Sequence, residues 1–336
     1  MSEKAVPPAF NPAITEKDVL ITGGAGSIGS ELARQVCQLA PRSLTLLDIN
    51  ENALYLLNQS LSRHYGMDIT PEVISIRDRT AIFRLFDRLR PQTVIHAAAH
   101  KHVPLMEQNP DQAVKNNIFG TLNLFDAAQQ YGAEKVVLIS SDKAVRPSSV
   151  MGATKQICEQ LCLGRNGPVF TAVRFGNVLD SAGSVIPLFR QQLHEEKRIL
   201  LTDRRMTRYF MSIPQAVQLI LQAAAENDRG KIYMLDMGNP VSIGQIALKV
   251  IKEEGFSPED VELVETGIRP GEKLEELLAS PDEYFTPTST PRLLSANAVS
   301  LFSADQKKCL LEKLKIAAEN IDHLQIRELL GLCKNE

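Results

Sequence analysis

The sequence predicts an α/β fold that contains a doubly wound parallel sheet, a smaller α/β domain and a C-terminal helical segment. Through the first half of the chain, short runs rich in β-branched residues alternate with amphipathic helical stretches. The runs are apolar on both faces, which is typical of strands in a parallel sheet that helices cover on both sides. After residue 178 the alternation gives way to loops and shorter elements, and this change predicts the second domain.

The elements follow one another in chain order. Strands are predicted over residues 19–22, 43–48, 71–76, 92–98 and 135–140. Helices are predicted to begin at Ser27, near Asn50 and near Met151, and to cover residues 77–89 and 111–130. Three prolines and a cluster of Ser and Thr residues predict a loop over 281–291. Beyond it, the sequence predicts one or two amphipathic helices that begin at a Ser303 cap.

The composition is that of a globular chain and excludes several other classes of protein. The 336 residues suffice for two domains, and 44% hydrophobic with 23% charged residues argue against a disordered or coiled-coil chain. A net charge of -3 provides no positive field for nucleic acid or an anionic membrane. The five cysteines form no C-x-x-C pair, and no segment has the character of a signal peptide or membrane span. We therefore expect a cytoplasmic protein with neither nucleic acid nor a membrane as partner.

A glycine-rich segment follows the first predicted strand directly. The glycines of ITGGAGSIGS open the first predicted helix, and the candidate residues are Gly23, Gly26, Ser27, Ile28 and Gly29. Glycine lets the backbone turn tightly and approach a pyrophosphate, whose charge then meets the helix N-terminus. A tight strand-to-helix turn without a ligand is the alternative. The strand before the glycines and the helix after them favour a Rossmann-type dinucleotide site.

Two acidic residues are candidates for the remaining parts of a dinucleotide. Asp48 ends the second predicted strand, where a carboxylate accepts both ribose hydroxyls and repels a 2′-phosphate. We therefore expect NAD rather than NADP. Asp78 follows the third predicted strand and either hydrogen-bonds the adenine amino group or caps the next helix.

The G-x-x-G-x-x-G spacing resembles the short-chain dehydrogenase/reductase superfamily, and specifically its extended, sugar-nucleotide branch. The segments HAAAHKHVPLMEQNP and NNIFGTLNLFDAA strengthen the resemblance. It implies that Ala97 and Ala98 pass beside the cofactor, that an Asn in the following helix supports the active site, and that Lys101 lies at the rim of the site with His102. The histidines of this segment have no further placed carboxylate or thiolate beside them, so no metal is expected.

Residues 140–155 (SSDKAVRPSSVMGATK) follow the fifth predicted strand and should lie at the edge of the sheet where ligands bind. Short-chain reductases normally carry Tyr-x-x-x-Lys here. Lys155 is present, whereas Met151 stands in place of the tyrosine, and a thioether cannot take a proton. Asp142 and Lys143 provide an adjacent acid and base, which suits elimination of water across neighbouring carbons. A capped loop with a surface ion pair is the alternative.

The pairing of S-D-K-A-V with V-M-G-A-T-K resembles the UDP-N-acetylglucosamine 4,6-dehydratases of the polysaccharide-biosynthesis group, over residues 15–280. The resemblance implies that NAD⁺ takes a hydride from C4 of the sugar and returns it at C6 after water has left. Lys143 would remove the C5 proton while Asp142 protonates the leaving C6 hydroxyl. We expect burial beside NAD⁺ and Lys155 to favour the neutral amine of Lys143. Ser141, acting through a water towards Lys155, is the candidate acceptor of the C4 hydroxyl proton.

The resemblance also implies residues that hold the nucleotide sugar. Arg174 and Asn177 match binding positions of the family's substrate loop, with a structural ion pair as the alternative for Arg174. Arg269 of RPGEK would clamp the diphosphate and Glu272 would accept a ribose hydroxyl, with a solvated charged turn as the alternative. The other expected substrate residues are the closing segment Gly183, Ser184 and Val185 and the lid residues Thr207 and Arg208.

These assignments divide the chain into residues 15–178 with 212–240 as the NAD-binding domain, 179–211 with 241–300 as the substrate-binding domain, and 303–336 as the C-terminal helical segment.

We expect a homo-oligomer that acts on a UDP-sugar. The match at residues 150–155 favours a dehydratase that retains the C5 configuration, and an inverting dehydratase is the nearest rival. A 4-epimerase would need the missing tyrosine. A non-catalytic NAD-binding regulator would need neither Asp142 nor Lys143. Uridine and guanosine both remain open as the nucleotide.

Overall fold

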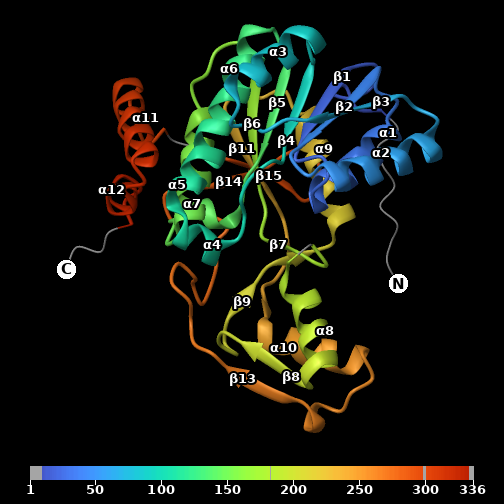
Figure 1. The fold of residues 1–336 in the computed structure, drawn as a ribbon, viewed down its shortest axis with the longest axis vertical. Coiled ribbons are helices and arrows are strands. Elements are labelled where there is room, and N and C mark those ends of the chain that lie inside the picture. The colour runs from blue at the N-terminus through green and yellow to red at the C-terminus, as the bar shows by residue number, and fades with distance from the viewer. Residues whose placement is uncertain (1–9, 182, 298–299, 333–336) are drawn as a thin grey trace.

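One large sheet forms the centre of the molecule (Figure 1). Over the described residues (10–181, 183–297 and 300–332), the computed structural model arranges nine strands in the order β14-β15-β11-β6-β5-β4-β1-β2-β3. From β3 to β11 all neighbouring strands are parallel, which confirms the predicted doubly wound sheet. These strands are β1 (Asp18–Thr22), β2 (Ser43–Asp48), β3 (Ile69–Val73), β4 (Thr93–His96), β5 (Lys135–Ile139), β6 (Val169–Arg174) and β11 (Lys231–Leu235).

Helices cover both faces of this sheet, because alternate residues of its strands enter different cores. Ile21 and Ile95 pack with α1, α2 and α9, whereas their neighbours Leu20 and Val94 pack with α3, α6 and α7. This arrangement explains why the strand sequences are apolar on both faces. The covering helices are α1 (Ser27–Cys37), α2 (Glu51–Tyr65), α3 (Arg79–Leu89), α6 (Gly120–Gln130), α7 (Val150–Cys162) and α9 (Ile213–Ala225).

Two elements of the first half differ from their predicted bounds. The strand predicted over 71–76 lies two residues earlier as β3, where Pro71 is tolerated because β3 is an edge strand. The helix predicted over 111–130 is divided into shorter pieces. These are α5 (Pro110–Ala113), the π-helix η1 (Val114–Phe119) and α6, and a further short helix, α4 (Val103–Gln108), precedes them. A π-helical turn inside a helix often accompanies a functional site.

The loop prediction over 281–291 is wrong for its central part. Residues Phe285–Pro287 form β14, which pairs antiparallel with β15 (Leu293–Ala296), and β15 pairs antiparallel with β11. Proline is compatible with β14 because this strand is the edge of the sheet. These strands belong to the large sheet, although residues 241–300 were assigned to the substrate-binding domain. The division into domains otherwise stays a prediction.

A smaller body with its own core lies below the large sheet in Figure 1. Its buried cluster includes Phe189 and Leu193 of α8 and Ile246 of α10, packed around Ile199 of β8. Short strand pairs, β7 with β10 and β9 with β12, lie in the chain segments around it. The elements are β7 (Asn177–Val178), α8 (Val185–Glu196), β8 (Arg198–Leu201), β9 (Thr207–Arg208), β10 (Phe210–Met211), β12 (Val241–Ser242), α10 (Ile243–Glu253), the 3₁₀-helix η3 (Pro258–Asp260) and β13 (Glu262–Glu265).

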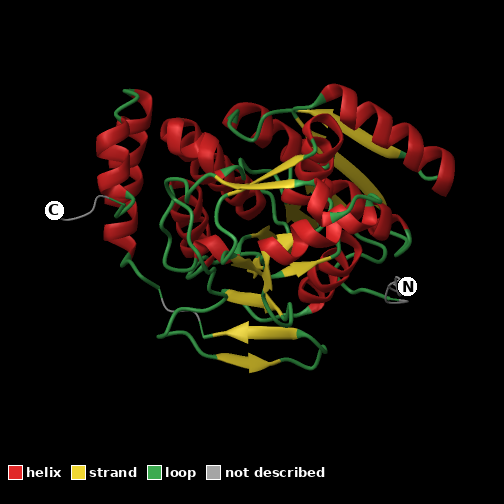
Figure 2. Ribbon diagram, turned by 90° about the horizontal axis from the view of Figure 1, so that it is seen from below, coloured by secondary structure: helices red, strands yellow, loops and turns green. Residues whose placement is uncertain are grey.

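The C-terminal helices α11 (Ala304–Glu319) and α12 (His323–Leu329) lie along one side of the large body (Figure 2). Ser303 and Gln306 form a capping box at the start of α11, so the predicted cap is confirmed. Leu314 and Ile326 are buried in the same core as α6 and α7. Residues 333–336 of the predicted segment 303–336 lie outside the described residues. None of the helices in the described part of the chain has the length and hydropathy that a membrane span requires.

Candidate active site

The glycine-rich turn lies where β1 and β4 end side by side, at the point where the strand order reverses. It folds tightly on itself, since a Cβ added to Gly29 would lie 1.9 Å from the carbonyl oxygen of Gly23. Gly23 in turn packs against the backbone of Ala97 and Ala98. The turn therefore needs glycine at these positions, and it lies beside Ala97 and Ala98; a contact of these alanines with the cofactor stays a prediction.

Gly29→Ala is expected to weaken NAD binding by about tenfold or more and to lower the free energy of unfolding by about 1–3 kcal/mol, because the new methyl group meets backbone that cannot move aside. Isothermal titration with NAD⁺ and urea unfolding measure the two effects. Gly244→Ala in α10 is the control, because an added Cβ there meets only ordinary or slightly tight contacts, the nearest at 3.3 Å. An unchanged NAD affinity in Gly29→Ala would contradict the assignment.

The N-terminus of α1 fits the pyrophosphate of a dinucleotide. Gly26 is its N-cap and provides no side-chain hydrogen bond, whereas α2, α3 and α7 have side-chain caps. Ser27 and Ile28 form the first turn of α1. Asp48 accepts a hydrogen bond from the amide of Ala25 at 3.0 Å, which holds its carboxylate beside the glycine turn. These residues fit NAD, and binding of NAD stays a prediction.

Asp78 caps α3. Its side chain accepts a hydrogen bond from the amide of Ala81 at 2.9 Å, which is the second of the two predicted possibilities. A contact with adenine stays a prediction.

The predicted acid and base form an ion pair just after β5, in the 3₁₀-helix η2 (Asp142–Ala144), with Asp142 buried and Lys143 partly exposed. Lys143 Nζ donates to Asp142 Oδ1 at 3.0 Å and to Asn177 Oδ1 at 3.3 Å. The Asp142 side chain is 0% exposed, so a surface ion pair does not describe it. Within the described residues, Asp142 Oδ2 has no hydrogen-bond partner. A buried carboxylate oxygen without a partner is costly, and a substrate hydroxyl would satisfy it.

The helix α7 lies close against this pair. A Cβ added to Gly152 would lie 2.3 Å from the carbonyl oxygen of Lys143, so glycine allows η2 and α7 to touch. Met151 and Lys155 are buried on α7. Lys155 Nζ donates to the carbonyl oxygen of Ile139 at 2.8 Å, and burial lowers the pKa of Lys155.

Ser141 is bonded to the predicted acid. The Ser141 hydroxyl donates to Asp142 Oδ1 at 2.8 Å and accepts from the backbone amide of Lys143. The relay from Ser141 through a water towards Lys155 stays a prediction. Lys155 is likewise bonded to Ile139, and the groups that contact the Lys143 ammonium are an amide and carboxylates.

Asn117 of the π-helix η1 ties the end of β4 to α7. Its side-chain nitrogen donates to the His100 carbonyl at 3.1 Å and to Thr154 Oγ1 at 3.0 Å, and its oxygen accepts from the His100 amide. The motif NNIFG pointed to an asparagine here without deciding between the two.

The histidines of this region have structural surroundings. His96 bridges Thr22 and Thr121 through its two ring nitrogens, and burial, followed by the nearby positive charge of Lys155, lowers the pKa of His96 to about 3. Its imidazole is therefore neutral. In the described part of the chain, no group of three or more His, Cys, Asp or Glu residues is placed to hold a metal ion.

Arg174 lies in a buried ion-pair network, which is the structural alternative for this residue. Its guanidinium makes two hydrogen bonds of 2.7 Å to the carboxylate of Glu159 and one of 2.7 Å to Glu283. Ser140 also donates to Glu159, at 2.6 Å. Each guanidinium nitrogen makes one of these hydrogen bonds, so three of the five N–H groups of Arg174 are engaged with carboxylates.

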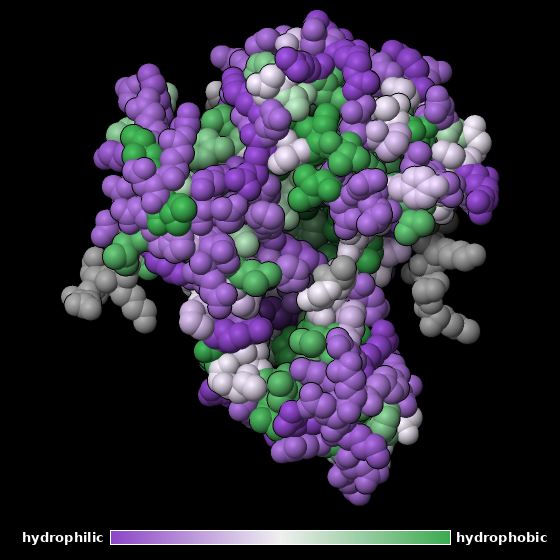
Figure 3. Space-filling model, viewed as in Figure 1, coloured by the Kyte–Doolittle hydropathy of each residue, from purple (hydrophilic) through white to green (hydrophobic). Residues whose placement is uncertain are grey.

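The remaining candidate substrate residues lie in the chain segments around the smaller body. Thr207 and Arg208 form β9, and Arg208 is buried and donates to the carbonyls of Lys273 and Leu274. Their role as lid residues stays a prediction. Arg269 is exposed and pairs with Glu272 at 2.7 Å. The segment Gly183, Ser184 and Val185 begins α8, and Gly183 packs against His102, the neighbour of Lys101. Figure 3 shows the surface hollowed between the two bodies.

A protein-family model described as polysaccharide biosynthesis protein matches residues 19–298. The chain belongs to this polysaccharide biosynthesis family.

The relatives of this family member include proteins from several bacteria. The capsular polysaccharide biosynthesis protein CapD of Staphylococcus aureus is 46% identical over 276 residues, which cover 80% of this chain and 46% of CapD. A UDP-N-acetylglucosamine 4,6-dehydratase (inverting) of Campylobacter jejuni is 31% identical, over 80% of this chain and 78% of that protein. The X-ray structure of Pen from Bacillus thuringiensis matches with a TM-score of 0.77 and 34% identity, over 84% of this chain and 89% of Pen. The chain spans about half the length of the curated relatives it matches with the highest identity.

Sequence reasoning missed one site residue of this family member. Glu276 follows the RPGEK turn, and its buried carboxylate lies 3.9 Å from Lys143 Nζ. Its sequence neighbourhood, EKLEEL, contains three glutamates, and nothing in the spacing distinguishes the one that the fold turns inward.

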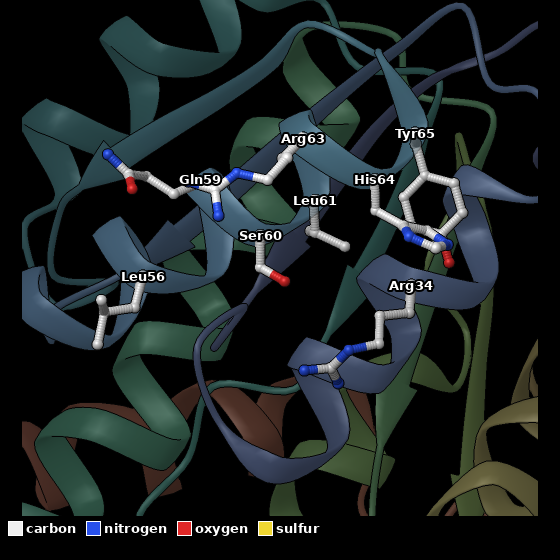
Figure 4. Close-up of a pocket in the computed structure, with 8 residues that line it drawn as sticks. All are labelled: Arg34, Leu56, Gln59, Ser60, Leu61, Arg63, His64 and Tyr65. Atoms are coloured by element: carbon white, nitrogen blue, oxygen red, sulfur yellow. The ribbon is translucent and has the colours of Figure 1, made fainter.

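A separate surface pocket lies between α1 and the C-terminal half of α2 (Figure 4). Its lining residues come from these helices alone, and it contains none of the candidate site residues. The lining residues are Arg34, Leu56, Gln59, Ser60, Leu61, Arg63, His64 and Tyr65.

Proposed function

We propose that the chain catalyses NAD-dependent loss of water from UDP-N-acetylglucosamine, which yields the 4-keto-6-deoxy sugar. The ion pair between the buried Asp142 and Lys143 beside α7, with Met151 where reductases carry tyrosine, is the observation that supports this proposal. The name of the Campylobacter jejuni relative describes the same reaction class. Assembly into a homo-oligomer stays a prediction.

The NAD site fits the first requirement of the reaction. The contribution of the cofactor, when bound, is a reversible hydride exchange that turns the C4 hydroxyl into a ketone and later saturates C6. The N-terminus of α1 would hold its pyrophosphate and Asp48 its ribose, with Ala97 and Ala98 against its reactive end. Lys155 would lie near the oxidised carbon, as the resemblance implies.

The chain's own acid and base perform the elimination. Lys143 accepts the C5 proton and Asp142 donates a proton to the departing C6 oxygen, so that the C5–H and C6–O bonds break, a C5=C6 bond forms and water leaves. The reactive state needs a neutral amine and a neutral carboxylic acid. Moving one proton along the 3.0 Å contact between Lys143 and Asp142 provides both at once. Elimination then regenerates the ammonium and the carboxylate, and the Lys143 ammonium would return a proton to C5 when the hydride enters at C6. Ser141, through a water towards Lys155, would accept the proton of the C4 hydroxyl.

Incubation of the chain with UDP-N-acetylglucosamine and NAD⁺ is expected to yield a product lighter by one water in mass spectrometry. A 4-epimerase would leave the mass unchanged, and a regulator would leave the sugar unchanged. GDP-mannose in place of the UDP-sugar tests the nucleotide. We propose retention at C5 from the match at residues 150–155, and NMR of the product distinguishes retention from inversion. Absence of water loss under conditions where NAD⁺ binds would reject the dehydratase proposal.

A further inference from the structure

The Lys143 ammonium faces a second carboxylate besides Asp142. Glu276 lies in the segment that follows β13, with Oε1 at 3.9 Å from Lys143 Nζ. Its side chain is 4% exposed, and within the described residues Oε2 has no hydrogen-bond partner. A carboxylate in such surroundings is expensive to bury. This free-energy cost indicates that Glu276 has a functional role besides packing.

The backbone around Glu276 is fastened directly to the catalytic turn. Lys273 Nζ donates to the carbonyl oxygen of Val145 at 3.0 Å, immediately after η2. Arg208 donates to the carbonyls of Lys273 and Leu274. The segment that precedes Glu276 is therefore tied both to the catalytic turn and to β9.

The charged groups around Lys143 and Glu276 form a small and closed set. Asp142 and Glu276 are the carboxylates, and Lys143, Lys273 and Arg208 are the cations, with Lys273 Nζ at 3.7 Å from Glu276 Oε2. Burial raises the pKa of Glu276, and the neighbouring cations oppose this shift.

We infer that Glu276 is a positioning residue for the reaction: its carboxylate holds the Lys143 amine beside Asp142 and makes it a stronger base. Positive charge develops on Lys143 as the C5 proton arrives, and a carboxylate less than 4 Å away stabilises that charge in a water-poor site. The inference rests on the proposed function for its role in catalysis. The electrostatic effect on Lys143 itself does not depend on the substrate.

Glu276→Gln tests the inference, with Glu275→Gln as the matched control, because Glu275 is the exposed neighbour in the chain. Lysines are methylated with ¹³C-formaldehyde, and the Lys143 signal is assigned by its absence in Lys143→Arg. Removing the negative charge destabilises the ammonium, so the NMR titration midpoint of Lys143 is expected to fall by about one pH unit or more in Glu276→Gln. Glu275→Gln is expected to leave it in place. An unchanged midpoint in Glu276→Gln overturns the inference.

The pH profile of water release is a second readout that a merely structural role would not move. In the plot of kcat against pH, the acidic limb of Glu276→Gln is expected to shift to lower pH, because Lys143 then loses its proton more easily. The plateau of kcat is expected to fall about tenfold, because Lys143 is then a weaker base. Glu276→Asp keeps the charge at a greater distance, so its shift should be smaller and in the same direction. If Glu276→Gln does not fold, the shift in Glu276→Asp tests the inference in its place. If the wild-type chain releases no water, the proposed function is rejected. The effect of Glu276 on Lys143 is tested separately, because the NMR titration does not depend on the reaction.

Discussion

Lys143→Arg is expected to lower kcat for water release by about 10²–10⁴-fold, the usual contribution of a general base. Arginine keeps a cation opposite Asp142 and Glu276, which lie 3.0 Å and 3.9 Å from Lys143 Nζ. It cannot give up its proton at neutral pH, so it cannot accept the C5 proton. The substitution therefore separates basicity from ion pairing. The rate is measured by mass spectrometry of the sugar nucleotide, with NAD affinity measured in parallel.

Asp142→Asn should cost a similar factor, because the amide preserves shape but donates no acidic proton. Groups that act as a unit are not additive, so the double variant is expected to be hardly slower than either single one. Lys115→Arg is the matched control: Lys115 pairs with Asp111 at 2.9 Å, away from η2, and its kcat should match the wild type. Water release by Lys143→Arg at the wild-type rate would exclude Lys143 as the base.

Local sequence patterns predicted those elements whose bounds depend on interactions between residues close together in the sequence. The strand β2 has its predicted bounds, and α1 and the C-terminal helices begin at or next to the predicted residues because caps and glycines act over a few positions. The adjacent acid and base could be named because they are neighbours in sequence.

Contacts between distant segments could not be predicted in this way. Glu283 meets Arg174 across 109 positions, and Glu276 reaches Lys143 only because Lys273 binds Val145, 128 positions away. β14 forms despite its proline because an edge of the sheet is available to it. Arg174 was interpreted as a substrate residue because its sequence neighbours match a substrate loop. Its side-chain partners lie far away in the sequence, on α7 and before β14, and local patterns cannot reveal them.

Arg174→Met is expected to lower the free energy of unfolding by about 3–5 kcal/mol, since it leaves the buried carboxylate of Glu159 without a cation. The Arg174 and Glu159 side chains are 5% and 0% exposed. Urea unfolding of the chain measures the loss. Arg88→Met is the control, because Arg88 is 58% exposed in its pair with Glu72 and such a pair contributes about 0–1 kcal/mol. The double variant Arg174→Met/Glu159→Met should recover much of the stability, because it removes the unpaired charge.

The destabilisation caused by Arg174→Met should shrink in acid. Burial opposes ionisation of Glu283, but the Arg174 guanidinium prevails and lowers the pKa of Glu283. A carboxylate whose pKa is lowered on folding stabilises the fold above its unfolded pKa and loses this contribution as the pH falls through its folded pKa. Wild type and Arg174→Met should therefore differ more at pH 7 than in acid. If instead Arg174→Met is as stable as the wild type and loses affinity for UDP-N-acetylglucosamine, Arg174 is a substrate residue that releases its carboxylates on binding.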